Sequence, residues 1–308
     1  MPIRIAIVGL GKIARDQHIP VIAASSQFEL AATASRNNRL DGVASFRTIE
    51  DLIASDVAFD AVALCQPPQG RYEAARAAIA AGKHVFLEKP PGATLSEVRA
   101  LEGQAKEKGV TLFASWHSRC APGVEAARQW IAAQGRVVSA RIEWKEDVRY
   151  WHPGQQWIWE PGGLGVFDPG VNALSIATEI LPNPFFLTRA ALDFPSNRAA
   201  PIAAELSFAD AEGAPIEAVF DFRQTGPQTW DITVETDGGP LKLSKGGSEL
   251  FINGARQETA AEAEYSGLYT RFAELIVSQR SDVDLAPLQH VADAFLRGER
   301  RIAEAFED

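Results

Sequence analysis

The fold is decided near the start of the chain, where residues 3–14 read IRIAIVGLGKIA. Residues 3–8 are mostly apolar, which indicates a strand buried on both faces of a parallel sheet. A Gly9-x-Gly11-x-x-Ala14 pattern follows, where a helix is expected to begin. The first glycine permits a tight turn, the second lets a pyrophosphate approach the backbone, and the small third residue lets the helix pack on the strand. Because a strand precedes it and a helix follows, the pattern predicts a dinucleotide site; the alternative is a tight turn without a ligand.

The rest of the first 118 residues alternates between strand-like apolar runs and helix-like stretches. This rhythm predicts an α/β fold with a doubly wound parallel sheet and helices on both faces, a Rossmann domain over residues 1–118. The expected helices are 12–24, with an interruption at Pro20, 49–54, 71–81 and 95–108, and the further strands are 28–34, 61–64, 84–87 and 111–114.

The chain changes character after residue 118, where several short alternating runs follow one another. They predict a second α/β domain over residues 119–308 with a mainly antiparallel open sheet, and the last helix could pack back on the first domain. The expected strands are 137–148, 186–192, 202–208, 216–223, 229–236, 241–243 and 250–252, and the expected helices are 125–133, 172–181, 265–280 and 288–307.

Composition excludes several classes of protein. The 308 residues carry a net charge of −10 without a basic stripe, so we expect no nucleic-acid partner. No apolar run approaches the roughly 20 residues that span a bilayer, and residues 3–10 lack the features of a secretion signal. Cys65 and Cys120 have no metal-ligand spacing and make no disulfide framework. We therefore expect a cytoplasmic protein that needs no metal.

The cofactor is predicted from the ends of the first two strands. A chain specialised for NAD usually carries Asp or Glu where this chain has Ser35 and Arg36. A carboxylate would repel the 2′-phosphate of NADP, whereas Ser35 can donate to it and Arg36 can pair with it. We expect NADP to be preferred and NAD to be accepted; the alternative is that Arg36 is a solvated loop residue. The expected cofactor contacts are Gly9, Gly11, Lys12, Ile13, Ser35, Arg36, Gln66, Pro67, Pro68, Glu88, Lys89, Trp116 and His117.

The chemistry is expected at Glu88-Lys89-Pro90, which follows the fourth strand. In an open parallel sheet, ligands bind beyond the carboxyl ends of the strands, so Lys89 lies where a substrate would meet a nicotinamide. Taken alone, a lysine before a proline is more often an exposed residue before a turn than a catalytic one.

The order of these motifs resembles one family. Residues 9–14, the Glu-Lys-Pro tripeptide at 88–90 and residues 162–172, which read GGLGVFDPGVN, resemble the Gfo/Idh/MocA oxidoreductases over essentially the whole chain. Residues 144–148 (WKEDV) and 151–157 (WHPGQQW), with the FDPG of residues 167–170, more narrowly resemble the bacterial L-arabinose/D-galactose 1-dehydrogenases. The resemblance implies that the lysine of the tripeptide contacts both substrate and cofactor, that a cis bond can precede Pro90, and that the open sheet could form a homo-oligomer.

The resemblance implies an NAD(P)-dependent aldose 1-dehydrogenase. Such an enzyme removes a hydride from the anomeric carbon of L-arabinose or D-galactose and leaves the lactone. Most of the wider family has His where this chain has Asn172, so the proton of the C1 hydroxyl must go elsewhere. The candidates to accept it are Lys89 and Asp168. Asn172, four residues after Asp168 and on the same helix face, would orient the hydroxyl. Asp168 could instead be only a helix N-cap followed by a proline.

A sugar pocket is expected around the tryptophans of residues 144–159. Aromatic rings pack on the C–H faces of a pyranose, while Glu146, His152 and His117 could bind its hydroxyls together with Lys89, Asp168 and Asn172. Taken singly, Trp144, Trp151, Trp157 and Trp159 could each be core residues. The alternatives are another sugar oxidoreductase of this family, acting by ring-carbon oxidation or ketoreduction, or a non-enzymatic NAD(P) or sugar sensor.

Overall fold

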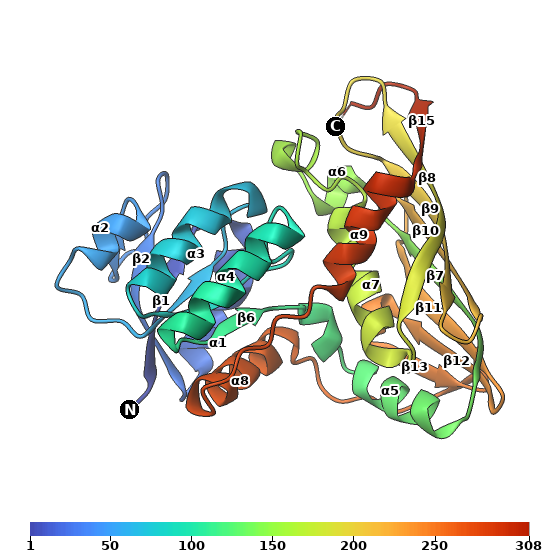
Figure 1. Cartoon of the computed structure of the whole chain (residues 1–308), viewed down its shortest axis with the longest axis horizontal. Helices are drawn as coiled ribbons and strands as arrows, with labels where there is room; N and C mark the ends of the chain where they lie inside the picture. The colour runs from blue at the N-terminus through green and yellow to red at the C-terminus, as the bar shows by residue number, and fades with distance from the viewer. Residues whose placement is uncertain (308) are drawn as a thin grey trace. The chain divides into compact units, whose positions relative to one another are not determined.

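The computed structural model describes residues 1–307, which form two compact units (Figure 1). The first unit combines Met1–His117 with Tyr265–Leu285, and the second combines Ser118–Glu264 with the chain from Ala286 onward. The boundary falls close to the expected residue 118. However, residues 265–285 belong to the first unit, where the sequence had predicted a second domain over all of residues 119–308.

The first unit is built on a parallel sheet with strand order β3-β2-β1-β4-β5-β6. This confirms the predicted Rossmann-type sheet, and the short edge strand β3 is an addition that the sequence did not predict. The strands are β1 (Ile3–Val8), β2 (Phe28–Ala34), β3 (Ala44–Phe46), β4 (Ala61–Leu64), β5 (His84–Leu87) and β6 (Leu112–Ala114).

Helices cover both faces of this sheet. Helices α2, α3 and α4 pack on one face through aliphatic side chains such as Leu52, Ile79 and Leu101. The other face carries α1, which continues from the π-helical segment η1 without the expected break at Pro20, and α8. The elements are η1 (Ala14–His18), α1 (Ile19–Ala24), α2 (Ile49–Ile53), η2 (Pro68–Gly70), α3 (Arg71–Ala80), α4 (Leu95–Lys108) and α8 (Glu264–Val277).

Helix α8 joins the first unit because its aromatic residues complete the core of that unit. Phe272 is fully buried and packs against Phe28, Phe86 and Phe113 of the sheet. Tyr269, one turn earlier on the same face of α8, packs against Phe28 and Phe86. These rings remove a large apolar surface from water, which explains why the chain returns to the first unit after residue 264.

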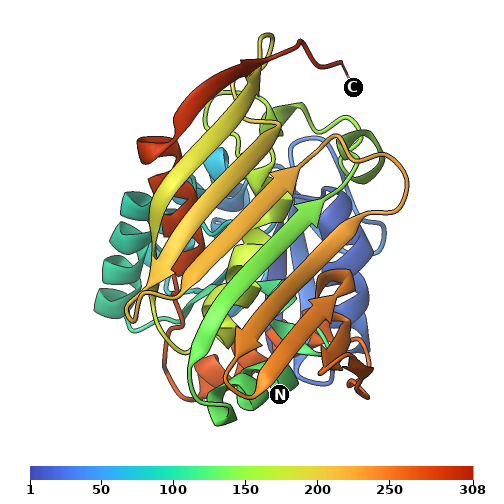
Figure 2. The ribbon, with the colours of Figure 1, turned by 90° about the vertical axis from the view of Figure 1, so that its right-hand side faces the viewer.

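The second unit is built on a nine-stranded sheet with order β14-β13-β12-β11-β7-β10-β9-β8-β15 (Figure 2). Two pairs, β7 with β10 and β8 with β15, are parallel, and the other pairs are antiparallel, as the sequence predicted for most of the sheet. The strands are β7 (Val137–Lys145), β8 (Phe185–Pro195), β9 (Ala203–Asp210), β10 (Pro215–Asp221), β11 (Thr229–Thr236), β12 (Gly239–Ser244), β13 (Glu249–Ile252), β14 (Ala255–Arg256) and β15 (Glu299–Ala303).

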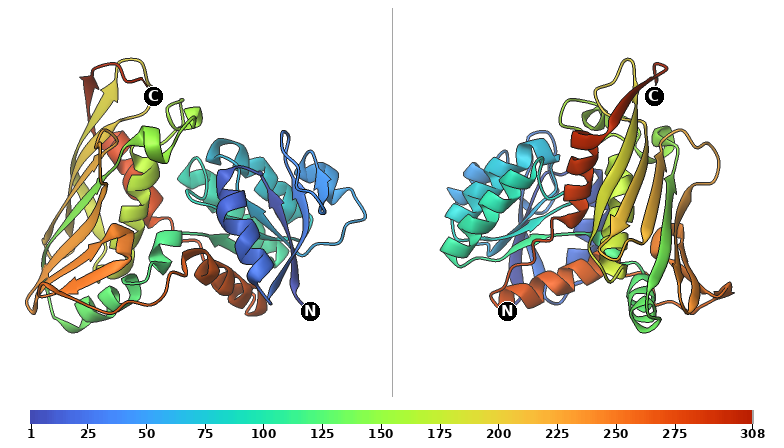
Figure 3. Two further views of the ribbon diagram at one scale, coloured as in Figure 1. Left: turned by 180° about the vertical axis from the view of Figure 1, so that it is seen from behind. Right: turned by 45° about the vertical axis from the view of Figure 1, so that its right-hand side comes forward.

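One face of this sheet is covered by helices. The two views of Figure 3 show α7 and α9 on the same side of the sheet. The helix expected over residues 288–307 ends early, because the chain turns at Gly298 and then pairs as β15 with β8. The helical elements are η3 (His117–Cys120), α5 (Val124–Ala133), α6 (Val148–Trp151), η4 (Gln156–Ile158), α7 (Phe167–Ile180), η5 (Lys245–Gly247) and α9 (Ala286–Arg297). Within residues 1–307, no helix has the length and apolarity required to cross a bilayer.

Candidate active site

The glycine loop after β1 has the shape that a dinucleotide requires. Gly9 has φ +95°, and a Cβ there would lie 2.7 Å from the backbone nitrogen of Gln66, so no larger residue fits without a shift of the backbone. A Cβ on Gly11 would meet no atom within 4 Å, which leaves open space beside that backbone. The loop therefore fits the predicted cofactor, whose pyrophosphate would approach the backbone of residues 9–13.

The predicted cofactor residues all follow strands of the same parallel sheet. The glycine loop with Lys12 and Ile13 follows β1, Ser35 and Arg36 follow β2, and residues 66–68 follow β4. Residues 88–89 follow β5 and residues 116–117 follow β6. Because the carboxyl ends of parallel strands lie at one edge, the structure brings these residues to a single edge of the sheet.

The backbone around Lys89 is held by a buried arginine that sequence analysis did not identify. Arg71, the first residue of α3, donates to the carbonyl oxygens of Glu88 and Pro90, on either side of Lys89. Its other terminal nitrogen lies 2.5 Å from the carbonyl oxygen of Gln66. The Lys89–Pro90 bond is cis, as the family resemblance implied. Arg71 thus connects the loop after β4 to the loop that carries Lys89.

The carboxylate of Glu88 is turned into the first unit. It is only 3% exposed and accepts hydrogen bonds from the Tyr265 hydroxyl at 2.7 Å and from the backbone N–H of Lys89 at 2.6 Å. The ring of His18 lies 3.2 Å from the same carboxylate. Burial opposes ionisation of Glu88, but the hydrogen bond and charge of His18, the charge of His117 and the bond from Tyr265 outweigh it and lower its pKa to about 2.

Sequence analysis did not identify these partners of Glu88. The structure pairs His18 with the Glu88 carboxylate, 70 residues away in the chain. Tyr265 and Tyr269 are four residues apart on α8, a spacing that places both side chains on one helix face. That spacing was visible in the sequence. However, Glu88, which Tyr265 contacts, lies about 180 residues earlier in the chain.

Two further predicted residues follow β6 and differ in their surroundings. Trp116 is buried, and its indole N–H donates to the carbonyl oxygen of Asp284 at 3.0 Å. His117 is partly exposed and stacks on the ring of Tyr265 with 5.5 Å between ring centroids. Trp116 is thus a core residue of the first unit, whereas His117 remains accessible at the edge where the other cofactor residues lie.

Asp168 is placed by the glycine-rich segment before α7. Gly165 has φ +54°, and a Cβ there would lie 2.2 Å from the carbonyl oxygen of Pro201, so only glycine lets the segment approach so closely. Helix α7 begins at Phe167 with Val166 as its N-cap, and Asp168 is the second residue of its first turn. Asp168 is therefore not the N-cap that the sequence allowed as an alternative. Asn172 is one turn further along the same face.

The second unit brings together three of the polar residues predicted for the sugar, Glu146, His152 and Asp168. The Nε2 atom of His152 lies 2.9 Å from an oxygen of Glu146, and its Nδ1 atom lies 3.5 Å from an oxygen of Asp168. His152 is thus held between two carboxylates. Glu146 is buried, and its second oxygen accepts the indole N–H of Trp230 at 2.8 Å. Glu146 therefore orients a histidine and a tryptophan.

An aromatic stack lies beside this polar group. Trp144 on β7 pairs directly with Trp230 on β11, with 5.9 Å between ring centroids. Trp151 at the end of α6 packs on Trp230 at 4.8 Å and is 37% exposed. Trp230 was not identified from the sequence, where it reads as one more residue of an alternating strand. Of the expected tryptophans, Trp144 and Trp159 are buried and Trp151 is accessible.

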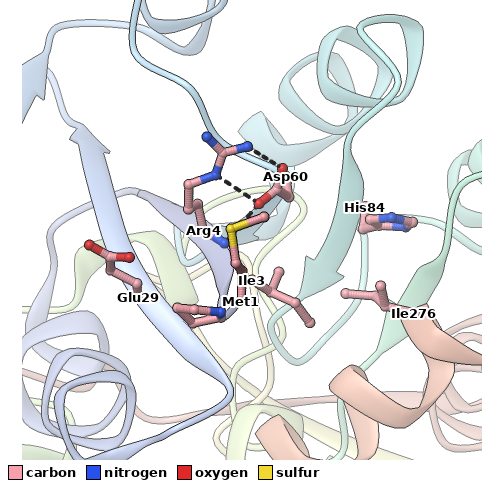
Figure 4. A pocket seen from close by; sticks show the side chains of 8 residues that line it. Met1, Ile3, Arg4, Glu29, Asp60, His84 and Ile276 are labelled. Atoms are coloured by element: carbon pink, nitrogen blue, oxygen red, sulfur yellow. Dashed lines mark hydrogen bonds and ion pairs between the residues drawn. The ribbon is translucent and has the colours of Figure 1, made fainter.

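A cavity of about 550 Å³ lies at the opposite edge of the first sheet (Figure 4). Its lining includes Ile3 and His84, which begin β1 and β5, together with the ion pair between Arg4 and Asp60. Because it lies at the amino ends of the strands, it is separate from the edge that carries the glycine loop. Within residues 1–307 no group of three or more His, Cys, Asp or Glu side chains could hold a metal.

The parallel sheet with its glycine loop defines a Rossmann-type fold, and comparison with known proteins identifies the class as an oxidoreductase with an NAD-binding Rossmann fold. Residues 3–115 match the model of the oxidoreductase family with an NAD-binding Rossmann fold, GFO_IDH_MocA. The chain is 45% identical over its whole length to galactose 1-dehydrogenase from Pseudomonas fluorescens, of which it covers 99%. The chain belongs to the Gfo/Idh/MocA oxidoreductases, as the resemblance of its motifs indicated.

Solved structures give the same result. The crystal structure of a D-galactose-1-dehydrogenase from Rhizobium etli has a TM-score of 0.95 and 59% sequence identity, and the match covers 99% of this chain and 98% of that chain. A 3-ketoreductase from Actinomadura kijaniata, in complex with NADP and TDP-benzene, has a TM-score of 0.84 at 18% identity and covers 98% of this chain and all of that chain. The second likeness concerns the fold alone.

Proposed function

We propose that the protein is an NAD(P)-dependent aldose 1-dehydrogenase that oxidises the anomeric carbon of D-galactose and L-arabinose to the lactone. The observation that carries this proposal is the full-length similarity to two galactose 1-dehydrogenases. The site supports it, because the second unit groups Asp168, His152 and Glu146 beside an accessible tryptophan. Such a set of hydroxyl-binding groups and an aromatic face suits a pyranose.

The reaction requires the removal of one hydride and one proton. The C1–H and O–H bonds of the hemiacetal break, and the C1 carbonyl of the lactone forms. When bound, the oxidised nicotinamide supplies the acceptor for the hydride. The protein has to bind the sugar, orient the C1 hydroxyl and accept its proton. We assign the acceptance of the proton to Lys89 and Asp168, which share this role, and the orientation of the hydroxyl to Asn172.

The surroundings of Asp168 explain how the proton could leave it. A carboxylate only accepts hydrogen bonds, so the 2.9 Å contact to Glu146 favours the tautomer of His152 with hydrogen on Nε2. The Nδ1 atom then faces Asp168 at 3.5 Å and can exchange a proton with it. In this proposal Glu146 fixes the ring of His152 and stabilises the positive charge that the ring gains when it takes up the proton. Both His152 and Glu146 also border the sugar.

The accepted sugars follow from their shapes. L-arabinopyranose matches D-galactopyranose without the exocyclic CH2OH group. One additional group at an apolar corner of a pocket changes selectivity by only about 1–3 kcal/mol. We therefore expect both sugars to be substrates.

The test is a panel of aldoses against NAD and NADP, with initial rates measured from the absorbance of the reduced cofactor and the lactone trapped with hydroxylamine. We expect D-galactose and L-arabinose to give lactone, and NADP to be used more efficiently than NAD because Ser35 and Arg36 replace the usual acidic residue. Turnover of no aldose, or a ring ketone as the product, would reject the proposal.

We further propose that copies of the chain associate through the open face of the second sheet. In Figure 2 this face is seen without a helix in front of the strands, over the part of the chain that the structure describes. Light scattering coupled to size exclusion should give a mass above the 33.3 kDa of one chain. A monomer at all concentrations would reject this association.

A further inference from the structure

A buried group of side chains connects the start of the first helix to the backbone of Lys89. Glu88 lies at its centre, with Lys89 N–H on one carboxylate oxygen and the Tyr265 hydroxyl on the other. The ring of His18 lies 3.2 Å from that second oxygen and is fully buried. The proposed reaction uses none of these side chains directly, so their arrangement needs an explanation of its own.

The contacts of His18 require a hydrogen on the ring nitrogen that faces Glu88. Its Nε2 atom faces the Glu88 carboxylate, which can only accept, and its Nδ1 atom lies 2.8 Å from the hydroxyl oxygen of Tyr269. The Tyr269 hydroxyl can accept from or donate to Nδ1, so the two contacts are met by a doubly protonated ring and also by a neutral ring with its hydrogen on Nε2. A buried carboxylate also needs a nearby cation, since an unpaired charge in the interior costs several kcal/mol.

Other titratable or charged side chains surround the pair of His18 and Glu88, and they come from several different elements of the first unit. Tyr265 and Tyr269 lie on α8, and His117 lies after β6. Cys65 follows β4, and Arg71 on α3 donates to the carbonyl oxygen of Glu88. Arg71 donates to backbone carbonyls on either side of Lys89, and the ring of His18 lies 3.2 Å from the Glu88 carboxylate itself.

We infer that His18 is a positioning residue, whose imidazolium holds the Glu88 carboxylate in the orientation that fixes the backbone of Lys89. The inference rests on the proposed function only in that Lys89 acts in the reaction. Glu88 transmits the effect through its bond to the N–H of Lys89, while Arg71 holds the carbonyl groups on either side. His18 contacts neither substrate nor cofactor in this account.

The electrostatics agree with this geometry. Burial opposes charge on His18, but attraction to Cys65 and Tyr269 and the hydrogen bond to Glu88 favour it, and the net effect raises the pKa of His18 well above 6.5. Together with the low pKa of Glu88, this predicts an intact ion pair at neutral pH.

The first experiment does not depend on any sugar. Long-range 15N–1H NMR of the histidine rings should show His18 as an imidazolium at neutral pH in the wild type and as a neutral ring in Glu88→Gln. Amide exchange of Lys89 should be about tenfold faster in His18→Gln than in the wild type, because the acceptor of its N–H becomes mobile. A neutral His18 ring in the wild type, or unchanged exchange, would overturn the inference.

The second experiment measures turnover. We expect His18→Gln to lower kcat by about tenfold, the size expected for one charge-assisted hydrogen bond, with the dissociation constant of NADPH unchanged. The kcat of this variant should also fall at acidic pH, an acidic limb that the wild type lacks, because burial without a cation raises the pKa of Glu88 and lets the carboxylate become protonated. The double variant His18→Gln/Glu88→Gln should lack this limb, since the titrating group is gone. A merely structural role for His18 would not produce a limb that depends on Glu88.

The matched control is His84→Gln, a partly buried histidine that begins β5 at the opposite edge of the sheet (Figure 4). It should leave kcat and its pH profile unchanged. If His18→Gln does not fold, Tyr265→Phe removes one donor from Glu88 and should give a weaker form of the same acidic limb. An equal loss of kcat in both histidine variants, or the same limb in the double variant, would overturn the inference. A wild type that oxidises no aldose would reject the proposed function, whereas the NMR and exchange results would still decide the role of His18.

Discussion

The backbone on both sides of Lys89 is fixed by buried groups, whereas its side chain is partly exposed. The fold around it therefore depends on Arg71 and Glu88. Replacement of the lysine should affect chemistry with little effect on stability. A substitution at Lys89 therefore tests the mechanism without a large change in the stability of the fold.

Lys89→Ala should lower kcat by about 10²–10⁴-fold, the range for loss of a group that transfers a proton. Initial rates with D-galactose and NADP measure this effect, and thermal unfolding should show a nearly unchanged midpoint. Lys108→Ala, at the exposed end of α4, is the matched control and should retain wild-type rates. Near-native turnover of Lys89→Ala would remove the lysine from the mechanism.

Asp168→Asn keeps the shape of the side chain but removes its ability to accept a proton. We expect kcat to fall by about 10²-fold or more, with a smaller change in KM. The exposed Asp56 gives a control variant, Asp56→Asn, that should behave as the wild type. If instead KM rises and kcat stays constant, Asp168 only binds the sugar.

At the scale of elements, the end of β2 should decide the choice of cofactor. Ser35→Asp places a carboxylate where the 2′-phosphate of NADP is expected, and like charges repel. We expect the ratio of kcat/KM for NADP to that for NAD to fall by more than about tenfold. Ser26→Asp, in the exposed bend two residues before the same strand, is the control and should leave the ratio unchanged. An unchanged ratio in Ser35→Asp would place the 2′-phosphate elsewhere.

Helix α8 stabilises the first unit through its aromatic face. Phe272→Ala should lower the free energy of unfolding by about 3–5 kcal/mol, because it leaves a cavity among Phe28, Phe86 and Phe113. Urea denaturation measures the loss. Phe186→Ala, at a phenylalanine that is 57% exposed on β8, should cost far less. Equal losses for the two variants would show that α8 does not complete the core.

The elements show what a sequence pattern can and cannot predict. The strand over residues 3–8 and the helix-like rhythm to residue 114 were predictable, because a buried strand next to a glycine motif has few other interpretations. The edge strands β3 and β15 were not, because three to five residues with exposed or partly exposed side chains carry no periodicity. Helix α7 begins five residues before the expected residue 172, since Pro169 is tolerated within a first turn.

The candidate site was predictable where its residues are close in sequence. Glu146, His152 and Asp168 lie within 23 residues of one another, and the structure groups them. Trp230 and the tyrosine partner of Glu88 were not predictable, because strand pairing and the return of α8 bring together residues about 80 to 180 positions apart. Long-range contacts of this kind leave no local signal.

At the scale of the whole molecule, stability should depend on pH through the pair of His18 and Glu88. The folded pKa of Glu88 is lowered from 4.5 to about 2, so its contribution is present above 4.5 and lost as pH falls. The folded pKa of His18 is raised above 6.5, so its contribution is present below 6.5 and lost as pH rises through the folded value. Both contributions are therefore complete between 4.5 and 6.5.

The free energy of unfolding should differ most between the wild type and His18→Gln within that window, because both partners of the pair are charged there in the folded protein. Urea denaturation at a series of pH values measures the difference. His84→Gln should show no maximum there, because burial lowers the pKa of His84. A difference that does not vary with pH would contradict the assignment of an ion pair.

The return of residues 265–285 to the first unit has a consequence for biosynthesis. A ribosome releases the N-terminal residues first, yet the aromatic face that covers Phe28 and Phe86 is translated only after residues 118–264 of the second unit. The nucleotide-binding half must therefore wait with an uncovered sheet face while the second unit emerges and folds, and it needs protection from aggregation during that interval.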